Sequence, residues 1–133
     1  MRVLVIGCVV VGVLAGCSSG LNRPVREVTA KADADSVQRI RVVAHSYWFD
    51  PNRIVVKAGV PVELSIKNSA FGVPHNLTCT APESDVIVSA DLGMFRGSKT
   101  VRFTPTTPGE YEFYCHKGSH AKKGMKGTLV VIQ

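Results

Sequence analysis

Four side chains that bind soft metal ions lie close together near the end of the chain. The segment EFYCHKGSHAKKGMKG, residues 112–127, contains Cys115, His116, His120 and Met125. Three of them follow the spacing Cys-x4-His-x4-Met. Structural zinc sites use four strong nitrogen or sulfur ligands and no methionine, and calcium and magnesium prefer oxygen ligands. A thiolate, an imidazole and a thioether together favour copper.

A trigonal blue-copper site needs a second histidine from elsewhere in the chain. His75 stands in FGVPHNLTC, after a proline-containing loop and directly before a predicted strand. This position suits a ligand that meets a loop at the same end of the fold. His45 lies inside a predicted strand, and strand alternation turns His116 away from the side of Cys115. His75 is therefore the candidate for the second imidazole ligand.

Other roles remain open for these residues at this stage. Two cysteines in an exported chain normally form a disulfide, so a bond between Cys79 and Cys115 is the alternative to a metal thiolate at Cys115. Met125 can serve as ordinary core packing, since methionine fills irregular gaps. His120 can be a solvated loop residue, and His75 a structural residue at a strand end.

The first seventeen residues, MRVLVIGCVVVGVLAGC, have a charged start, an apolar middle and small residues at the end. The apolar run is shorter than the roughly 20 residues of a spanning helix, so the pattern predicts a signal peptide over residues 1–16. The residues LAGC resemble the lipobox of bacterial lipoproteins. This resemblance implies cleavage after Gly16 and lipidation of Cys17. The alternatives are a plain secretory signal and an uncleaved anchor.

The segment after Cys17 is polar and contains no aromatic residue up to residue 36. It predicts a flexible tether over residues 17–36 and a single folded domain over residues 37–133. We expect a monomer that is exported and lipid-anchored, on the outer face of the cytoplasmic membrane or in a periplasm.

Basic residues gather around the candidate metal ligands. Removing Arg2 with the signal peptide leaves 15 of the 16 Lys and Arg residues against 10 Asp and Glu residues. Four lysines lie within the segment of residues 112–127, at positions 117, 122, 123 and 126. A basic rim there suits an acidic redox partner or anionic lipid headgroups. No nucleic-acid recognition motif is present.

Short β-rich runs separated by turn residues fill the region from residue 37 to residue 133, without a helical period. In EYEFYC, the side chains of Tyr111, Phe113 and Cys115 share one face. The runs predict an all-β fold, a Greek-key antiparallel β-sandwich of seven or eight strands. The segment VIVSADLGMFRGS, residues 86–98, does not distinguish between a strand, a helical turn and a loop.

The region from residue 37 to residue 133 resembles the cupredoxin family of type 1 blue copper proteins. The resemblance rests on YWFDPNRIVVKAGVPVELSIKN, on PHN at residues 74–76, and on PGEYEFYC with the histidine and methionine that follow. It implies a cupredoxin-like fold that binds one copper ion through His75, Cys115, His120 and Met125. It also implies that the Asn76 backbone N–H donates to the thiolate. The family often has Ser or Thr directly after the cysteine, where this chain has a histidine.

The expected function is electron transfer between redox protein partners, without enzymatic activity, because a copper with four such donors offers no evident open position to a substrate. A binuclear copper site needs a second cysteine four residues after Cys115, and Ser119 stands there. Two further alternatives are a copper chaperone or scavenger lipoprotein and a sandwich without metal.

Overall fold

The computed structural model describes residues 23–83 and 86–133. The predicted signal peptide and the lipidation site at Cys17 lie outside the described residues. Within them, no helix is both long and apolar enough to span a membrane.

The described chain folds into ten strands and one short 3₁₀ helix, which are β1 (Glu27–Thr29), β2 (Gln38–His45), β3 (Trp48–Asp50), β4 (Arg53–Lys57), β5 (Val62–Asn68), β6 (His75–Thr80), β7 (Val86–Gly93), β8 (Gly97–Phe103), β9 (Gly109–Tyr114), η1 (Ala121–Lys123) and β10 (Lys126–Ile132).

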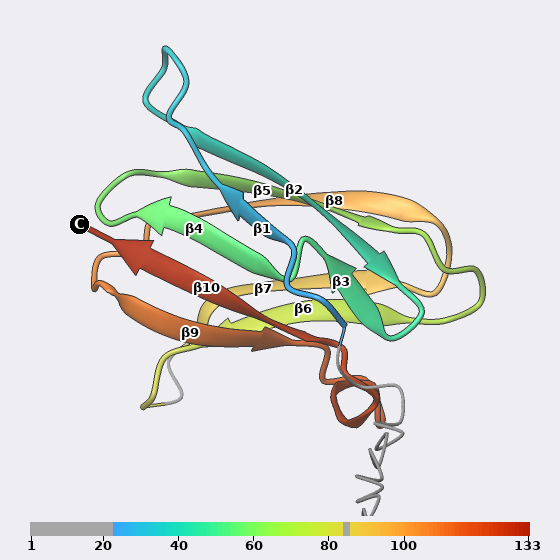
Figure 1. The fold of residues 1–133 in the computed structure, drawn as a ribbon. Coiled ribbons are helices and arrows are strands. Elements are labelled where there is room, and N and C mark those ends of the chain that lie inside the picture. Colours follow the sequence, from blue (N-terminus) through green and yellow to red (C-terminus); the bar gives the residue numbers. More distant parts are fainter. Residues whose placement is uncertain (1–22, 84–85) are drawn as a thin grey trace, which may run out of the picture.

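The strands form two packed sheets, as Figure 1 shows. The first sheet has the strand order β1-β4-β10-β9-β6-β7, and the second has the order β3-β2-β5-β8. The predicted β-sandwich is therefore confirmed. The sheets are mixed rather than purely antiparallel, because β4 pairs in parallel with β1 and β10, and β2 pairs in parallel with β5.

The ordered sheet begins earlier in the chain than the sequence indicated. The expected boundary lay at residue 37, with a flexible tether before it. Instead β1 pairs with β4 through Val28 and Ile54, and Ala32 forms an isolated bridge with Gln38. An edge strand of three residues needs one half-buried side chain to hold its place, and Val28 provides it by packing against the core. A segment this short carries no readable apolar period.

The segment of residues 86–98 contains the whole of β7 and the first two residues of β8. Val88 and Ala90 of β7 are buried and alternate with exposed residues, but the exposed hydrophobic side chains of Val86, Met94 and Phe95 obscure this alternation in the sequence. β7 lies at the edge of the first sheet and β8 at the edge of the second. Edge strands expose many side chains on both faces, as β8 does from Gly97 to Thr100. The structure has ten described strands instead of the expected seven or eight. The sequence left β7 unassigned, and β1 and β3 have only three residues each, which is too short to recognise.

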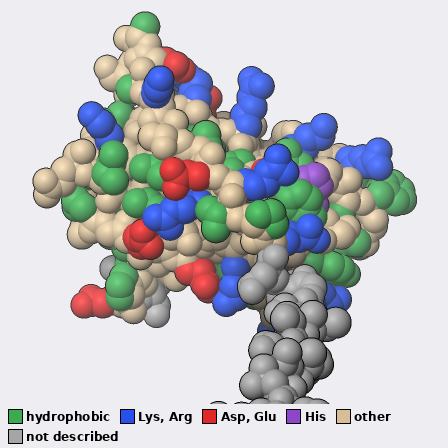
Figure 2. All heavy atoms as spheres, in the orientation of Figure 1, with side chains coloured by type: hydrophobic (Ala, Val, Ile, Leu, Met, Phe, Trp, Pro, Cys, Tyr) green, Lys and Arg blue, Asp and Glu red, His purple; other side chains and the backbone are tan. Residues whose placement is uncertain are grey.

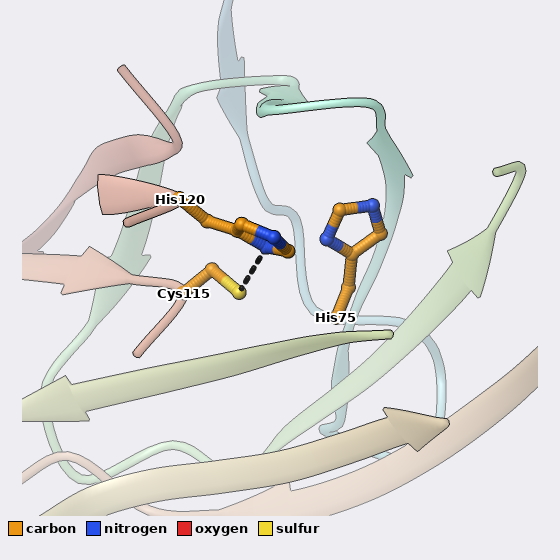
Figure 3. A group of neighbouring side chains, drawn as sticks. All are labelled: His75, Cys115 and His120. Atoms are coloured by element: carbon orange, nitrogen blue, oxygen red, sulfur yellow. Dashed lines mark hydrogen bonds between the residues drawn. The ribbon is translucent and has the colours of Figure 1, made fainter. Parts of the chain in front are cut away.

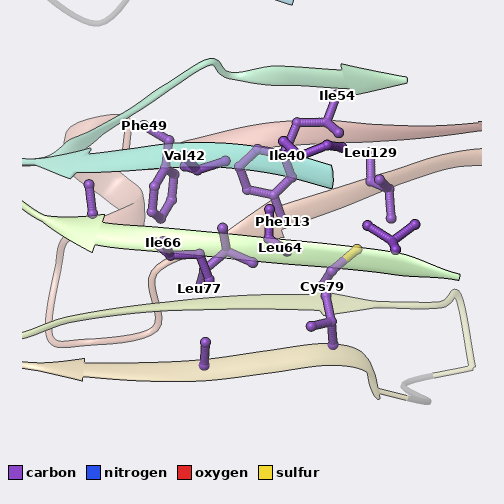
Figure 4. Packing of buried hydrophobic residues seen from close by; sticks show 14 of the residues in the cluster. Ile40, Val42, Phe49, Ile54, Leu64, Ile66, Leu77, Cys79, Phe113 and Leu129 are labelled. Atoms are coloured by element: carbon purple, nitrogen blue, oxygen red, sulfur yellow. The ribbon is translucent and has the colours of Figure 1, made fainter. Parts of the chain in front are cut away.

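The core lies between the sheets and is built by strand alternation (Figure 4). In β2 the residues that face inward are buried, whereas Arg39 and Arg41 are exposed. In β9 and the residue after it, Phe113 and Cys115 are buried as predicted, and Tyr111 packs against the core. The Phe113 ring meets Phe49 from the opposite sheet edge-on, with 5.5 Å between ring centroids. This packed interior fixes the positions at which β6 begins and β9 ends.

Candidate metal centre

The sheet brings two candidate ligands together because β6 and β9 are antiparallel neighbours. Thr78 pairs with Tyr114, so the first residue of β6 and the residue after β9 lie at the same end of the sandwich. These residues are His75 and Cys115. The chain then leaves β9, makes the short helix η1 and returns as β10. The loop carries His120 directly before η1.

The structure places His75, Cys115 and His120 in one cluster, shown in Figure 3. One ligand atom from each residue lies within 4.8 Å of the other two. The Cys115 Sγ atom is 3.5 Å from the His120 Nδ1 atom, and the ring centroids of the two histidines are 5.1 Å apart. His75 and Cys115 are completely buried, whereas His120 is half-buried. Three donors therefore converge at the end of the fold, with one of them near the surface.

Met125 is held beside this cluster by its backbone. Its N–H donates to the carbonyl oxygen of His120 at 3.1 Å, and its own carbonyl oxygen accepts from the N–H of Cys115 at 3.1 Å. The Met125 side chain is completely buried. The two hydrogen bonds close the loop from Cys115 to Met125 onto itself, so that the three residues from this segment occupy fixed positions.

His75 has the chemistry of a metal ligand. Neither of its ring nitrogens has a hydrogen-bond partner among the residues that the structure describes, although both are buried. A buried polar atom without a partner is costly, and native proteins rarely leave one unexplained. Burial, with a smaller contribution from His120, lowers the pKa of His75 to about 4. The ring is thus neutral near pH 7, with a lone pair available to a metal ion.

Hydrogen bonds from Asn76 connect the two segments that carry the ligands. The Asn76 backbone N–H points at the Cys115 sulfur at 3.5 Å, as the family resemblance implied. The Asn76 Oδ1 atom accepts from the His116 backbone N–H at 2.8 Å. Its Nδ2 atom lies 2.8 Å from both the Thr78 hydroxyl and the His116 Nδ1 atom. The ring nitrogen of His116 thus takes the place of the hydroxyl that the family often has there, and His116 lies outside the ligand cluster.

Among the described residues Cys79 and Cys115 are both free thiols, so the alternative of a disulfide between them is wrong. Cys79 points into the hydrophobic core, where burial raises the pKa of its thiol to about 12. It therefore stays protonated and apolar in the folded protein. Burial and the nearby Lys123 ammonium lower the pKa of His120, which favours its neutral form as well.

Tyr47 is a contact of this centre that the sequence did not reveal. It lies in the turn between β2 and β3, and its ring packs edge-on against His120 with 4.9 Å between centroids. A single tyrosine in a turn carries no spacing signal. Only the backbone conformation of this turn brings the ring to the ligand cluster.

Basic side chains gather at the same end of the molecule (Figure 2). Lys117 pairs with Asp91 at 2.9 Å, and Lys126 pairs with Glu112 at 3.3 Å. Lys122 and Lys123 are exposed and form no ion pair with the described residues. The positive charges of Lys122 and Lys123 are therefore not neutralised by a neighbouring carboxylate of the described residues, unlike those of Lys117 and Lys126.

Comparison with known proteins shows similarity to a protein family and to a plastocyanin. The family profile of the cupredoxin-like domain matches residues 9–131. A plastocyanin from Ulva prolifera is 37% identical over 92 residues, which cover 65% of this chain and 88% of that protein.

Two solved structures have a similar fold. Reduced auracyanin from Roseiflexus castenholzii superposes with a TM-score of 0.66 at 21% identity, over 71% of this chain and 97% of that one. The metal-binding domain of the Cu(I)-exporting P-type ATPase CopA from Streptococcus pneumoniae D39, solved with Cu(I), has a TM-score of 0.61 at 25% identity, over 81% of this chain and 97% of that one.

Proposed function

Because this chain belongs to the cupredoxin-like domain family, we propose that it binds one copper ion and carries single electrons between redox proteins. The observation that carries the proposal is the cluster of His75, Cys115 and His120, in which both buried nitrogens of His75 lack a hydrogen-bond partner among the described residues. One thiolate and two neutral imidazoles are the strong donors of a blue-copper site. Met125 is the proposed fourth, weak donor.

The surrounding residues prepare the donors for electron transfer. When bound, copper supplies a one-electron Cu(I)/Cu(II) couple. The chain contributes a ligand set that is already gathered, held by the Asn76 hydrogen bonds and by the closed loop that ends at Met125. Little has to move when the charge of the site changes by one. A site with four such donors has no evident place for a substrate, which agrees with the family assignment in arguing against an enzyme.

His120 is the proposed exit for the electron, because it is the half-buried member of the cluster. Lys122 and Lys123 follow it by two and three residues in the sequence. This arrangement supports docking of a redox partner with an acidic surface at this end of the sandwich, where exposed cations steer association.

Membrane tethering is a further part of the proposal and rests on the sequence alone. The proposed order is a signal peptide over residues 1–16, a lipid on Cys17 and a tether that leads into the domain. Such a chain is exported and held at the outer face of the cytoplasmic membrane or in a periplasm. Radiolabelled palmitate should enter the wild-type chain and not the Cys17→Ser variant when both are expressed in a bacterium.

Copper delivery is the second candidate function. The similarity to a metal-binding domain solved with Cu(I), from a copper-exporting ATPase, favours it. Completely buried Cys115 and Met125 argue for retention of the ion instead, because a delivery site has to present its donors to an acceptor. Rapid handover of copper to an acceptor would support delivery, and slow loss would support the electron carrier.

Voltammetry of the copper-loaded chain tests the electron-carrier proposal. A reversible one-electron wave, together with repeated reduction by ascorbate and oxidation by ferricyanide without loss of copper, is the expected result. Release of the ion during each cycle would contradict a carrier and would favour delivery.

A further inference from the structure

Tyr47 adopts a backbone conformation that is unusual for its residue type. Its φ angle is +69°, in the left-handed region. Aromatic residues seldom adopt this region because the Cβ atom crowds the backbone. Such outliers persist where the surrounding structure over-determines them, and they cluster at functional sites. The conformation turns the Tyr47 ring toward the cluster of metal ligands.

The ring of Tyr47 contacts both histidines of that cluster. It meets His120 at 4.9 Å between centroids with an interplanar angle of 73°, and His75 at 6.4 Å with an angle of 88°. Both are edge-to-face geometries, which aromatic pairs prefer. The histidines come from different segments of the chain, before η1 and at the start of β6. One aromatic ring therefore bridges the two ligand-bearing segments.

Lys123 holds the ring from another direction. Its Nζ atom lies 4.0 Å from the centroid of the Tyr47 ring, within the range of a cation–π interaction. Lys123 is exposed and Tyr47 is half-buried, so the ring lies between the buried ligands and the solvent. The same lysine follows His120 by three residues, and the contact links the β2–β3 turn to η1.

The turn that carries Tyr47 is fixed by its flanking residues. The His45 and Trp48 rings stack with 4.0 Å between centroids and an angle of 11°. The His45 Nδ1 atom is 3.1 Å from the Ser69 hydroxyl, and the Arg23 guanidinium lies 4.5 Å from the centroid of the Trp48 ring. These contacts anchor the turn on both sides, so the position of the Tyr47 ring does not depend on the ligands alone.

We propose that Tyr47 is a positioning residue that closes the solvent side of the metal centre. Its ring restrains His120 and His75 and blocks the path by which solutes reach the Cys115 sulfur and the bound ion. The part of this role that concerns access to the bound ion rests on the proposed copper function. The part that concerns the accessibility of Cys115 does not depend on any metal.

Two rates measured on the full chain, in detergent and with Cys8→Ser and Cys17→Ser as background, test this role. The first is the transfer of Cu(I) to bathocuproine disulfonate. The second is the alkylation of Cys115 by iodoacetamide in the metal-free chain, followed by peptide mass spectrometry. Tyr47→Gly removes the ring at a φ angle that glycine accepts without strain. Tyr47→Phe is the matched control because it keeps the ring.

Tyr47→Gly should accelerate both rates by about tenfold, as expected when two aromatic contacts and one cation–π contact are lost. Tyr47→Phe should match the wild type. Lys123→Gln, an exposed change that leaves the turn intact, should give a smaller acceleration in the same direction. Unchanged rates in Tyr47→Gly and Lys123→Gln would overturn the proposal, as would a Tyr47→Phe variant as fast as Tyr47→Gly. If no variant binds Cu(I), the copper function fails, and the alkylation rate of Cys115 still decides the role of Tyr47.

Discussion

The side chain at position 125 should set the reduction potential of the site without being essential for its formation. A thioether is a soft donor that favours Cu(I) over Cu(II) relative to an oxygen donor. Met125→Gln offers an amide oxygen and should lower the potential, whereas Met125→Leu offers no donor and should raise it. A tenfold change in the relative affinity for the two oxidation states corresponds to about 59 mV for one electron.

Voltammetry of the three proteins measures this effect, and the expected order of potentials is Leu above Met above Gln. Met125 is completely buried, so both variants also change packing. A packing effect alone would not separate the two potentials in opposite directions. Equal potentials in all three proteins would remove Met125 from the site.

The buried thiol of Cys79 should make the protein less stable at alkaline pH. The unfolded thiol loses its proton near pH 9, whereas the folded one keeps it up to a pKa of about 12. Between these values the folded state holds more protons, so the free energy of unfolding falls as the pH rises. The slope is up to about 1.4 kcal/mol per pH unit.

Urea unfolding of the metal-free chain at several pH values above 8 checks this effect. Cys79→Ala lacks the thiol and should show a shallower decline than the wild type, although it is less stable at neutral pH because it leaves a small cavity. Parallel declines in the two proteins would mean that the thiol of Cys79 contributes nothing to the pH dependence.

Individual ligands were predictable from the sequence because their spacing reflects local geometry. Cys115 and His120 lie on one strand end and one short loop, and His75 stands at the start of a strand. The ligand roles of these residues and of Met125 remain proposals. The hydrogen bond between the Asn76 side chain and the His116 ring, and the contact of Tyr47 with His120, were beyond reach. Both depend on rotamers and on a left-handed turn, which side-chain periodicity does not encode.

At the scale of elements, Gly127 of β10 pairs with Phe113 of β9 and has no room for a side chain. A Cβ atom at this position would lie 2.2 Å from the Phe113 ring and 2.6 Å from the carbonyl oxygen of Asn52. Gly127→Ala should therefore shift the strand that returns from the ligand loop. Overpacking of this kind costs typically about 1–3 kcal/mol.

Chemical denaturation of the metal-free chain gives the comparison. Gly97→Ala is the matched control, because a Cβ there meets only the Phe95 carbonyl oxygen at 3.9 Å. The control should stay within about 0.5 kcal/mol of the wild type, as surface substitutions usually do. If Gly127→Ala were as stable as this control, β10 would not pack against Phe113 as described.

The long central strands were readable from sequence, whereas the short strands β1 and β3 and the edge strand β7 were not. Alternation in β2 and β9 predicted which residues are buried, because both strands present one face to the core. β1 was missed, and the segment of residues 86–98, which holds β7 and the start of β8, was left open. Their partners are known only once the sheets are assembled, and the exposed hydrophobic side chains of Val86, Met94 and Phe95 mask the alternation of β7.

At the scale of the whole molecule, the chain has a net charge of +6, and Lys122 is exposed at the end with the ligands. Oxidation of the reduced copper chain by ferricyanide, an anion, should slow as salt is added. Oxidation by tris(phenanthroline)cobalt(III), a cation, should accelerate, because exposed charges are screened over about 8 Å at physiological ionic strength.

Lys122→Glu should lower the ferricyanide rate by about two- to threefold at low salt. Lys57→Glu makes the same change of charge at the opposite end, since Lys57 pairs with Ile132 at the far end of β10. Stopped-flow traces of both variants separate local from overall charge. Equal effects of the two substitutions would mean that no docking face exists near His120.

The most direct test of the copper proposal is the visible and EPR spectrum of the chain after addition of one equivalent of Cu(II). A thiolate ligand at Cys115 predicts an intense charge-transfer band in the visible region and a narrow copper hyperfine splitting. Cys115→Ser should lose the band, and His116→Ala should keep it, since His116 lies outside the ligand cluster. A pale wild-type spectrum, or a Cys115→Ser protein that stays strongly coloured, would contradict the proposed site.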